Sequence, residues 1–436
     1  MNLDARRWFI LFWGVLANLC QGAAYASSVF AVPVLMHFHR FVLGPDGHAI
    51  IGPNHLPVLD MPKWALAFSL ELAMLPVGML LSGKIADQKS PRLIVFIGSI
   101  LFGGGILLAG FAQHLRYFYL GFGILAGLGS GCAYGTIVAT SQRWFPDRRG
   151  LASGLAVGAL GFGPVVIVPV ANMLMAGGKP ENTAMFALKV LGAAFFVIMA
   201  VASVFTVNPP KGYAPKGFVP RIPTQASTGT NDLNWAQMLS KGRFWLLYLL
   251  YVCGAFSGLM MISMAKPFAG EAMKGVILDP KALGAFAGYV VMTIALANAF
   301  GRLAWGAISD WTGRQWALVL MFLITAVTMF LIPSLSGVKS SLVLGAVLIG
   351  ACFGGYLGIF PPICADSFGA KNMMVNYALL FSGFAVAAIL GPMIGAHIQK
   401  HTGYNDAFTV GGCVAVLGLL VSLGMALSKP KPVVKA

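Results

Sequence analysis

The chain has 436 residues, of which 58% are hydrophobic and 10% are charged, and a composition this apolar excludes a soluble globular protein. The formal net charge of +16 lies in short polar segments between apolar runs, where basic residues fix the orientation of membrane helices and do not indicate nucleic-acid binding. Apolar runs of about 20 residues or more recur along the chain, and each can cross a hydrocarbon core of roughly 30 Å. The sequence therefore predicts a polytopic membrane protein of the all-α class.

Twelve membrane spans are predicted, separated by short polar breaks. They cover approximately residues 8–35, 64–82, 93–112, 117–139, 150–175, 184–206, 244–265, 283–308, 315–334, 341–364, 374–399 and 407–427. The first run is too long for the apolar region of a signal peptide and lacks a convincing cleavage site, so it is a retained helix. Lys and Arg are about twice as frequent in the cytoplasmic segments if both termini lie inside, which favours this orientation in the cell (inner) membrane.

Two connections are longer than the others. Residues 36–63 contain four histidines without further ligand spacing, which favours an ordered cap or a pH-sensitive loop over a metal site (His37, His39, His48 and His55). Residues 208–243 are rich in Pro, Gly, Ser and Thr and contain a segment, 231–240, that fits a short helix on the membrane surface. We therefore predict an N-terminal six-helix bundle over 1–207, a cytoplasmic linker over 208–243 and a C-terminal six-helix bundle over 244–436.

The sparse polar residues of the spans supply no nucleophile, base or metal constellation. All six cysteines fall in apolar runs without metal-ligand or redox spacing. The sequence also lacks the Gly-Lys-Ser/Thr loop of a nucleotide-binding site, which argues against a pump driven by ATP. We expect no enzymatic activity, no cofactor and no metal.

Arg302 needs a physical explanation, because it lies inside an apolar span. A central Arg costs about 2.5–3.5 kcal/mol on insertion scales, and such residues usually face a bundle interior or a water-filled cavity. Its planar fork can hold a carboxylate bidentately. Asn298 lies one helical turn earlier on the same face and can supply another hydrogen bond. The alternative is an Arg that pairs only with backbone carbonyls or a neighbouring helix.

A short motif occurs at equivalent places in the two halves of the chain. Residues 83–92 read Gly-Lys-Ile-Ala-Asp-Gln-Lys-Ser-Pro-Arg, and residues 306–314 read Gly-Ala-Ile-Ser-Asp-Trp-Thr-Gly-Arg. Glycine permits close approach, the Asp can cap an adjoining helix, and the basic residue stays on the cytoplasmic face. We expect a gating motif that consists of Asp87, Asp310, Arg92 and Arg314.

The duplicated loop motif resembles that of the major facilitator superfamily. Residues 143–154 (Arg-Trp-Phe-Pro-Asp-Arg-Arg-Gly-Leu-Ala-Ser-Gly), residues 208–213 (Asn-Pro-Pro-Lys-Gly-Tyr) and the stretch around Arg302 further resemble the oxalate:formate antiporter family and its bacterial monocarboxylate-transporter relatives. This resemblance covers nearly the whole chain. It implies two six-helix bundles that rock about a central site near the midplane and carry small carboxylates by exchange or with a proton.

By this resemblance, Arg302 is the ligand of the substrate anion and Asn298 is its helper. Tyr134 matches a tyrosine of span four that faces the site from the other bundle, where its phenol can donate to a carboxylate. Packing at the bundle interface is the alternative for Tyr134. Tyr356 and Tyr25 are weaker candidates of the same type.

The chain departs from the oxalate exchanger of this family at Phe384. That exchanger has a lysine midway along span eleven, where this sequence has a phenylalanine. A second carboxylate left unpaired in a low-dielectric cavity would cost several kcal/mol. We therefore expect a monocarboxylate substrate such as lactate, pyruvate, acetate or formate.

Glu71 is the only acidic residue well inside a span, and it is the main candidate for proton coupling. Desolvation penalises its charged form, so this carboxyl group can load and release a proton during transport. The alternative is a hydrated Glu near a helix end, or one paired with Lys189. His397, near the outer end of span eleven, is a second candidate, and an interfacial histidine fits it at least as well.

The expected function is secondary active transport of small monocarboxylates by alternating access, with proton symport. The partners are then the substrate, a proton or counter-anion, and the lipid bilayer, with no nucleic acid. A carboxylate exchanger of the oxalate:formate type and a proton-driven drug antiporter are the alternatives in the same class. A sensor that binds a carboxylate without moving it is not expected, because the sequence carries no signalling domain.

Overall fold

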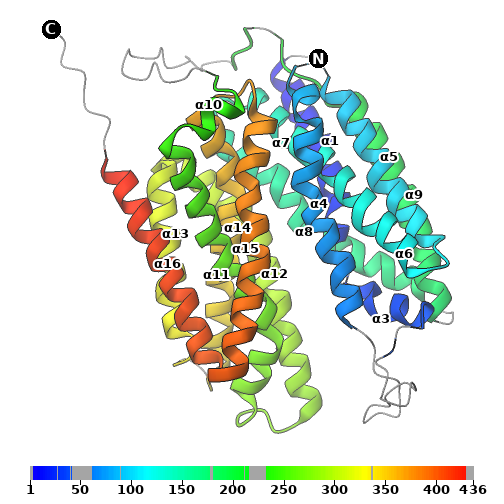
Figure 1. The fold of residues 1–436 in the computed structure, drawn as a ribbon, viewed down its shortest axis with the longest axis vertical. Helices are drawn as coiled ribbons and strands as arrows, with labels where there is room; N and C mark the ends of the chain where they lie inside the picture. The colour runs from blue at the N-terminus through cyan, green and yellow to red at the C-terminus, as the bar shows by residue number, and fades with distance from the viewer. Residues whose placement is uncertain are drawn as a thin grey trace. The chain divides into compact units, whose positions relative to one another are not determined.

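The computed structural model shows a chain built from helices (Figure 1). It describes residues 3–26, 28–39, 41, 61–88, 90–176, 180–210, 212–215, 232–334 and 337–428. The helices in chain order are α1 (Leu3–Gln21), α2 (Ala23–Ala26), α3 (Ser28–His37), α4 (Met61–Gln88), α5 (Pro91–Gly110), α6 (Leu115–Phe118), the π-helix η1 (Tyr119–Leu125), α7 (Ala126–Trp144), α8 (Arg149–Met175), α9 (Pro180–Phe205), α10 (Trp235–Leu239), α11 (Gly242–Met273), α12 (Pro280–Thr312), α13 (Arg314–Leu331), α14 (Lys339–Phe368), α15 (Met373–Thr402) and α16 (Tyr404–Leu427).

Within the described residues, 12 helical stretches are long and apolar enough to cross a membrane, which confirms the predicted number of spans and the all-α class. Two of these spans are interrupted. The first is divided by a turn at Gly22 between α1 and α2, and the fourth passes through α6, η1 and α7. The sequence pattern does not predict these interruptions, because apolar residues continue through both of them.

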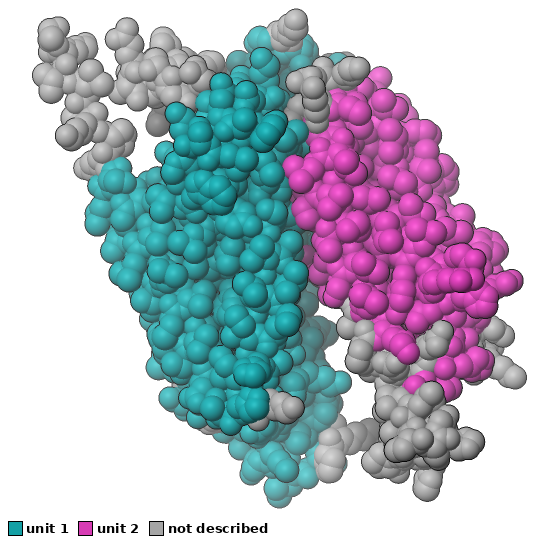
Figure 2. All heavy atoms as spheres, in the orientation of Figure 1, with its two compact units in different colours: residues 1–7, 141–161, 209–436 teal, residues 8–140, 162–208 magenta. Residues whose placement is uncertain are grey.

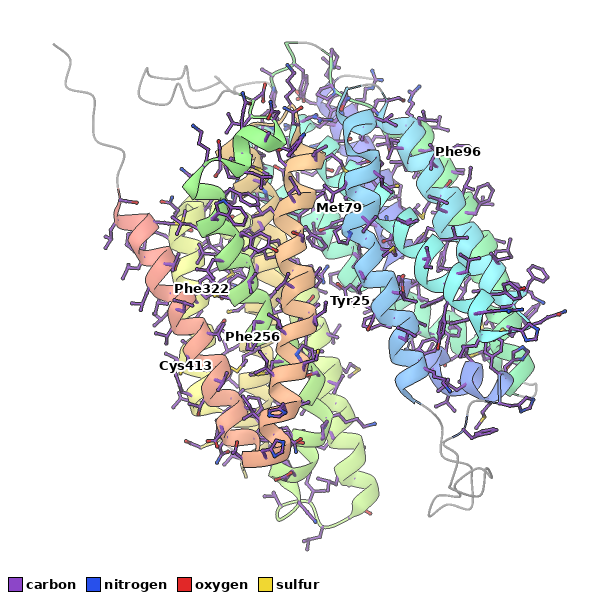
Figure 3. All side chains as sticks on the ribbon, viewed as in Figure 1. Tyr25, Met79, Phe96, Phe256, Phe322 and Cys413 are labelled. Carbon is purple, nitrogen blue, oxygen red and sulfur yellow. The ribbon has the colours of Figure 1, made fainter. Side chains whose placement is uncertain are left out.

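Apolar side chains cover the outside of the helices as well as their interior. Phe96 on α5 is 42% exposed and points outward, whereas Phe322 on α13 is fully enclosed by neighbouring helices (Figure 3). Many other large apolar residues share the exposure of Phe96. An exterior of this kind is costly in water and suits the hydrocarbon region of a bilayer.

The chain forms two compact units, which Figure 2 colours separately. Unit 1 comprises residues 1–7, 141–161 and 209–436, and unit 2 comprises residues 8–140 and 162–208. The end of α7 and the first part of α8 therefore pack with the C-terminal helices. The division into bundles over 1–207 and 244–436 describes the order of the helices along the chain and stays a prediction.

Unit 2 is held together by backbones that approach closely at glycines. A side chain added at Gly103 on α5 would meet the backbone of Phe196 on α9, at 2.5 Å from its N atom. On α7, Gly127 and Gly131 face α4, where added Cβ atoms would meet the carbonyl oxygens of Glu71 and Leu75. In a membrane, where lipid competes with apolar side chains, such small residues give helices the close contact that stabilises their association.

Unit 1 uses the same device between α12 and α14. Gly301 on α12 lies against the backbone of Ala351, and Gly358 on α14 lies against that of Arg302. At the other end of these helices, buried apolar side chains of α11, α12, α13, α14 and α16 form one cluster. Phe268, Met329 and Phe408 are among its largest members. The helix that carries Arg302 is thus fixed along its length by neighbours within unit 1.

Of the linker, the structure describes residues 208–210, 212–215 and 232–243. The predicted short helix is present as α10, where Asn234 and Gln237 form a reciprocal capping box. The linker is anchored beside it, because the Leu233 N–H donates to the Phe368 carbonyl at 3.0 Å. Tyr213 lies against the Trp144 ring at 4.9 Å, and burial raises the pKa of its phenol.

Most of the predicted His-bearing connection lies outside the described residues, and His48 and His55 are among the residues not described. His37 ends α3, where its ring lies 5.0 Å from that of Phe38. His39 follows in a left-handed backbone conformation with φ 49°. The expectation of an ordered cap or pH-sensitive loop stays a prediction.

Adjacent glycines of α5 offer a matched test of this packing. We expect Gly103→Ala to lower the free energy of unfolding by about 1–3 kcal/mol, because the backbone of Phe196 must move. Gly104→Ala has no neighbour within 4 Å of the new Cβ and should leave stability unchanged or raise it by up to about 1 kcal/mol. Unfolding in mixed detergent micelles measures both variants. Equal effects would contradict the close approach of α5 and α9.

Candidate substrate-binding site

Arg302 lies in the interior of unit 1, on α12, with 2% of its surface exposed. Its guanidinium Nε donates a hydrogen bond to the Asn298 Oδ1 atom at 3.0 Å. Asn298 is itself buried, one turn earlier on α12. The predicted Arg–Asn pair is therefore present, and the amide holds the cation in a fixed orientation.

A second helix takes part in positioning Arg302. The Nη1 atom donates to the Val157 carbonyl of α8 at 3.0 Å, so the charge is also stabilised by a main-chain dipole. The alternative for this residue is an Arg that pairs only with backbone carbonyls or a neighbouring helix. The structure contains a backbone contact together with the Asn298 contact. Both interactions hold the guanidinium, and neither supplies a negative charge.

Glycines on α8 make room for this arrangement. Gly150, Gly154, Gly158 and Gly161 recur at intervals that place them on one helical face. A Cβ atom at Gly161 would lie 3.4 Å from the Arg302 Nε, and one at Gly154 would lie 2.8 Å from the Arg302 carbonyl oxygen. Only small residues let α8 come this close to α12.

Phe384, on α15, belongs to a cluster of aromatic rings contributed by three helices of unit 1. Its ring lies 5.0 Å from Phe381 and 6.3 Å from Phe353, stacked in both cases. Tyr251 on α11 lies 6.4 Å from Phe384 and stacks on Phe360 at 4.0 Å. Phe384 is thus part of an aromatic wall.

Tyr356, on α14, lies among α11, α13 and α14. Its hydroxyl is 3.3 Å from Thr325 Oγ1, and its ring lies 4.9 Å from that of Phe322. A Cβ atom at Gly254 would meet the ring at 2.8 Å. These contacts give Tyr356 a packing role in unit 1, and its suggested role in substrate binding stays a prediction.

The predicted tyrosines of unit 2 are Tyr134 and Tyr25. Tyr134 lies on α7 with 3% of its surface exposed. Tyr25 is half-buried on α2, just after the turn at Gly22 (Figure 3). Both positions fall within membrane spans. Their proposed contact with the substrate stays a prediction.

A buried polar network in unit 2 was not predicted from the sequence. The Gln21 Nε2 donates to Asn18 Oδ1 at 2.9 Å, and the Ser130 hydroxyl donates to Gln21 Oε1 at 2.9 Å. All three side chains are almost completely buried. Ser130 precedes Tyr134 by one helical turn on α7. The spacing of Asn18 and Gln21 within an apolar run was the signal that could have identified it.

Glu71 is buried on α4 with 3% exposure, and its Oε2 atom has no hydrogen-bond partner. The suggested partner Lys189 lies on α9, where its ammonium is 4.2 Å from the centre of the Phe111 ring. The role of Glu71 in proton coupling stays a prediction.

His397 is exposed near the end of α15, with its ring 4.6 Å from that of His401. Its role in proton coupling stays a prediction. Among the described residues, no group of three or more His, Cys, Asp or Glu side chains is arranged to hold a metal ion.

Asp310, from the second copy of the repeated motif, caps the start of α8. Its two carboxylate oxygens accept the N–H groups of Gly150 and Leu151, each at 3.0 Å. Arg314 forms an ion pair with Asp310 at 2.6 Å and also contacts Asp366 at 3.2 Å. The motif therefore ties the first turn of α8 to the ends of α12, α13 and α14.

Asp366 is a member of this charged cluster that the sequence pattern does not indicate. It accepts from Arg149 at 2.5 Å as well as from Arg314. Arg143, at the end of α7, donates to the carbonyls of Ala370 and Lys371 in the turn between α14 and α15. Residues 143–149 thus contact the C-terminal part of the chain through two basic side chains, Arg143 and Arg149.

The first copy of the motif is only partly described. Arg92 is exposed in the first turn of α5. The backbone of Asp87 belongs to α4, and its side chain lies outside the described part of the structure. The gating role of this copy stays a prediction.

A separate groove of about 400 Å³ lies between α12 and α14, on a different side of α12 from Arg302. Met292, Phe300, Trp305 and Val347 contribute to its lining, which includes no charged residue. An anion would gain no ionic interaction there. The Arg302 region is the better candidate for a carboxylate.

Comparison with known proteins matches residues 14–274 and 275–436 to the family model described as Major Facilitator Superfamily. The chain is 25% identical over 445 residues to the "Oxalate:formate antiporter" of Oxalobacter formigenes, covering 100% of this chain and 95% of that protein. It is 26% identical to the human "Monocarboxylate transporter 11", with 84% and 74% covered. A solved Escherichia coli fucose:proton symporter aligns with a TM-score of 0.69 over 97% of this chain and 98% of its own, at 11% identity, which shows the fold alone.

The charged cluster at the start of α8 predicts a stability effect. We expect Asp310→Asn to lower the free energy of unfolding by about 1.5–3 kcal/mol, because it removes the ion pair with Arg314 and weakens the cap of α8. Asp406→Asn, at an exposed position in the first turn of α16, should cost less than about 1 kcal/mol. Denaturation in mixed micelles compares the two. A smaller loss for Asp310→Asn than for Asp406→Asn would show that the cluster contributes little.

Proposed function

Because the chain belongs to the major facilitator superfamily, as its motifs predicted, we propose that it carries small monocarboxylates across the membrane by alternating access with proton symport. The family consists of transporters and not enzymes, and the chain is a multi-pass membrane protein. Lactate, pyruvate, acetate and formate are the substrates that we propose. We place both termini and the linker in the cytoplasm, on the basis of the Lys and Arg distribution.

The buried Arg302 is the observation that carries this proposal. A guanidinium remains charged in proteins, so burying it in a span requires a compensating interaction. Asn298 and the Val157 carbonyl orient it with neutral oxygens. A carboxylate that binds the planar guanidinium fork gains a charge-assisted interaction with it. Binding of the substrate anion then neutralises the site.

The aromatic wall that contains Phe384 supports a substrate with one carboxylate group over a substrate with two. The sequence of α15 between Met373 and Ala396 contains no basic residue, and Phe384 is packed among other rings. A dicarboxylate would therefore bury a second negative charge without a partner on this helix, at a cost of several kcal/mol. A short apolar tail would instead contact aromatic surface, which favours its transfer from water.

We propose that two tyrosines from the N-terminal half of the chain also bind the substrate. Tyr134 and Tyr25 are the candidate donors, with the phenol of Tyr134 hydrogen-bonded to the substrate carboxylate when the bundles close. In this proposal, binding of the anion at Arg302 favours closure of the site around the substrate. The conformational change then depends on occupancy.

The charged cluster around Asp310 and Asp366 is proposed as a gate. Its members contact the start of α8, next to the second copy of the repeated motif. In this proposal, the ion pairs and hydrogen bonds of the cluster break and re-form as the bundles move. Arg92, Asp87 and Arg314 complete the two copies of the motif in this proposal.

Glu71 is proposed as the proton site. Its burial and the unpartnered Oε2 atom favour the neutral acid, so deprotonation requires access to water. Alternating access provides that contact on each side of the membrane in turn. One proton then accompanies each carboxylate, and uptake follows a pH gradient.

Two other modes of transport remain the alternatives. An exchanger of the oxalate:formate type is favoured by the full-length relative of that name, and it would require a carboxylate on the opposite side of the membrane. A proton-driven drug antiporter would use Glu71 and leave Arg302 as a structural residue. The two experiments that follow distinguish these modes.

Uptake of labelled lactate, pyruvate, formate and oxalate into proteoliposomes tests the anion site. We expect Arg302→Ala to reduce uptake of the preferred monocarboxylate by about 10- to 100-fold, because the variant loses the charge-assisted pair with the substrate. Asn298→Asp should abolish uptake while keeping the fold, because the new carboxylate pairs with Arg302 from 3.0 Å away.

The control is Arg116→Ala, an exposed basic residue on α6, which should leave uptake unchanged. Thermal melting and size-exclusion profiles establish that each variant is folded. Normal uptake by a folded Asn298→Asp protein would refute the carboxylate site. Preference for oxalate over the monocarboxylates would refute the interpretation of Phe384.

Glu71→Gln separates coupling from substrate binding. We expect this variant to lose uptake driven by a pH gradient and to keep exchange of internal for external monocarboxylate, because the amide cannot release a proton. Glu271→Gln, at an exposed end of α11, should retain both activities. Full accumulation of the monocarboxylate by Glu71→Gln under a pH gradient would exclude Glu71 as the proton site. Exchange without any pH-driven uptake in the wild type would establish an antiporter.

A further inference from the structure

Two histidines of α15 have no part in the transport mechanism proposed above. His397 and His401 are four residues apart on one helix, and both are exposed. Their ring centroids lie 4.6 Å apart, with the ring planes inclined at 54°. The two imidazoles therefore project from the same face of the helix, one turn apart.

Paired imidazoles at this spacing have a definite chemistry. Neutral imidazole is a common ligand of Zn²⁺, Cu²⁺ and Ni²⁺, with a metal–nitrogen distance of about 2.0–2.1 Å for zinc. Two histidines at positions i and i+4 of a helix bind a single ion in a recurrent zinc motif. Because both rings are exposed, they can turn through the small angles needed to bring one nitrogen of each to the same ion.

The end of the helix also favours a bound cation. His401 belongs to the last turn of α15, which ends at Thr402 and is followed by Gly403 in a left-handed conformation with φ 103°. The carbonyl groups at the end of a helix carry a partial negative charge that stabilises a cation nearby. A bound metal would therefore be attracted by the helix end as well as by its two nitrogen ligands.

We propose that His397 and His401 form a surface site for one divalent transition-metal ion. Two protein nitrogens bind the ion and water completes its coordination, since the described residues include no group of three His, Cys, Asp or Glu side chains. Affinity follows the order Cu²⁺ above Ni²⁺ and Zn²⁺, as expected for imidazole ligands. The site does not depend on the identity of the transported substrate.

Metal titration of the full-length protein without an affinity tag tests this site. Calorimetry with Cu²⁺ and with Ni²⁺ should give one site per chain at pH 7.5. Loss of a residue that only supports a metal ligand typically weakens metal binding by roughly 10-fold or more. His397→Ala and His401→Ala each remove a direct ligand, so each should weaken binding by at least this factor. Both positions are exposed, so we expect both variants to fold.

The other histidines provide the matched control. A variant with His37, His39, His48 and His55 changed to Ala should keep the site, as should His114→Ala. Electron paramagnetic resonance of bound Cu²⁺ should report two nitrogen ligands in the wild type and one in either single variant. Binding should weaken at pH 5, because protons compete with the metal for imidazole. Unchanged Cu²⁺ binding in the His397→Ala/His401→Ala double variant, or loss of binding in the four-histidine variant alone, would overturn the proposal.

Discussion

The burial of one permanent positive charge constrains the centre of unit 1. Arg302 lies inside a span, where an uncompensated guanidinium is costly. Oriented oxygen atoms around it accept hydrogen bonds and stabilise its charge. Asn298 fixes the guanidinium from its own helix, and the Val157 carbonyl fixes it from α8. The second contact requires α8 to approach α12 closely, which the glycines of α8 permit. Charge, hydrogen bonding and helix packing are therefore coupled at this position.

Close backbone approach has a wider role in this protein. Lipid is as apolar as leucine, so burial of apolar side chains gives little net attraction between helices in a bilayer. Glycines at Gly103 and Gly131 in unit 2, and at Gly301 and Gly358 in unit 1, let backbones meet instead. The ends of the helices are organised by charge, and Asp310 and Asp366 connect α8 to α12, α13 and α14 there. Packing inside the span and ion pairs at its end thus act on the same helix.

The proposed specificity follows from the contrast between this cation and the aromatic wall that contains Phe384. A single carboxylate satisfies the cation, and an apolar substituent suits the wall. The same combination of one cation and an aromatic wall distinguishes the proposed monocarboxylate substrate from oxalate, the dicarboxylate in the name of the full-length relative. The two chains nevertheless align from end to end. At 25% identity, similar helices can surround different ligands, because function depends on a few side chains of the site.

The sequence by itself determined the membrane class, the twelve spans, the family and the pairing of Arg302 with Asn298, because hydropathy and helical spacing are local properties. Tertiary structure decided which partners came from other helices. Val157 beside Arg302, Asp366 beside Arg149 and Arg314, and Ser130 beside Gln21 are far apart in the chain, and no spacing rule relates them. The turn at Gly22 and the π-helix η1 also required the structure, because apolar residues continue through both interruptions. Local composition specifies where helices form, and packing between them specifies which polar groups meet.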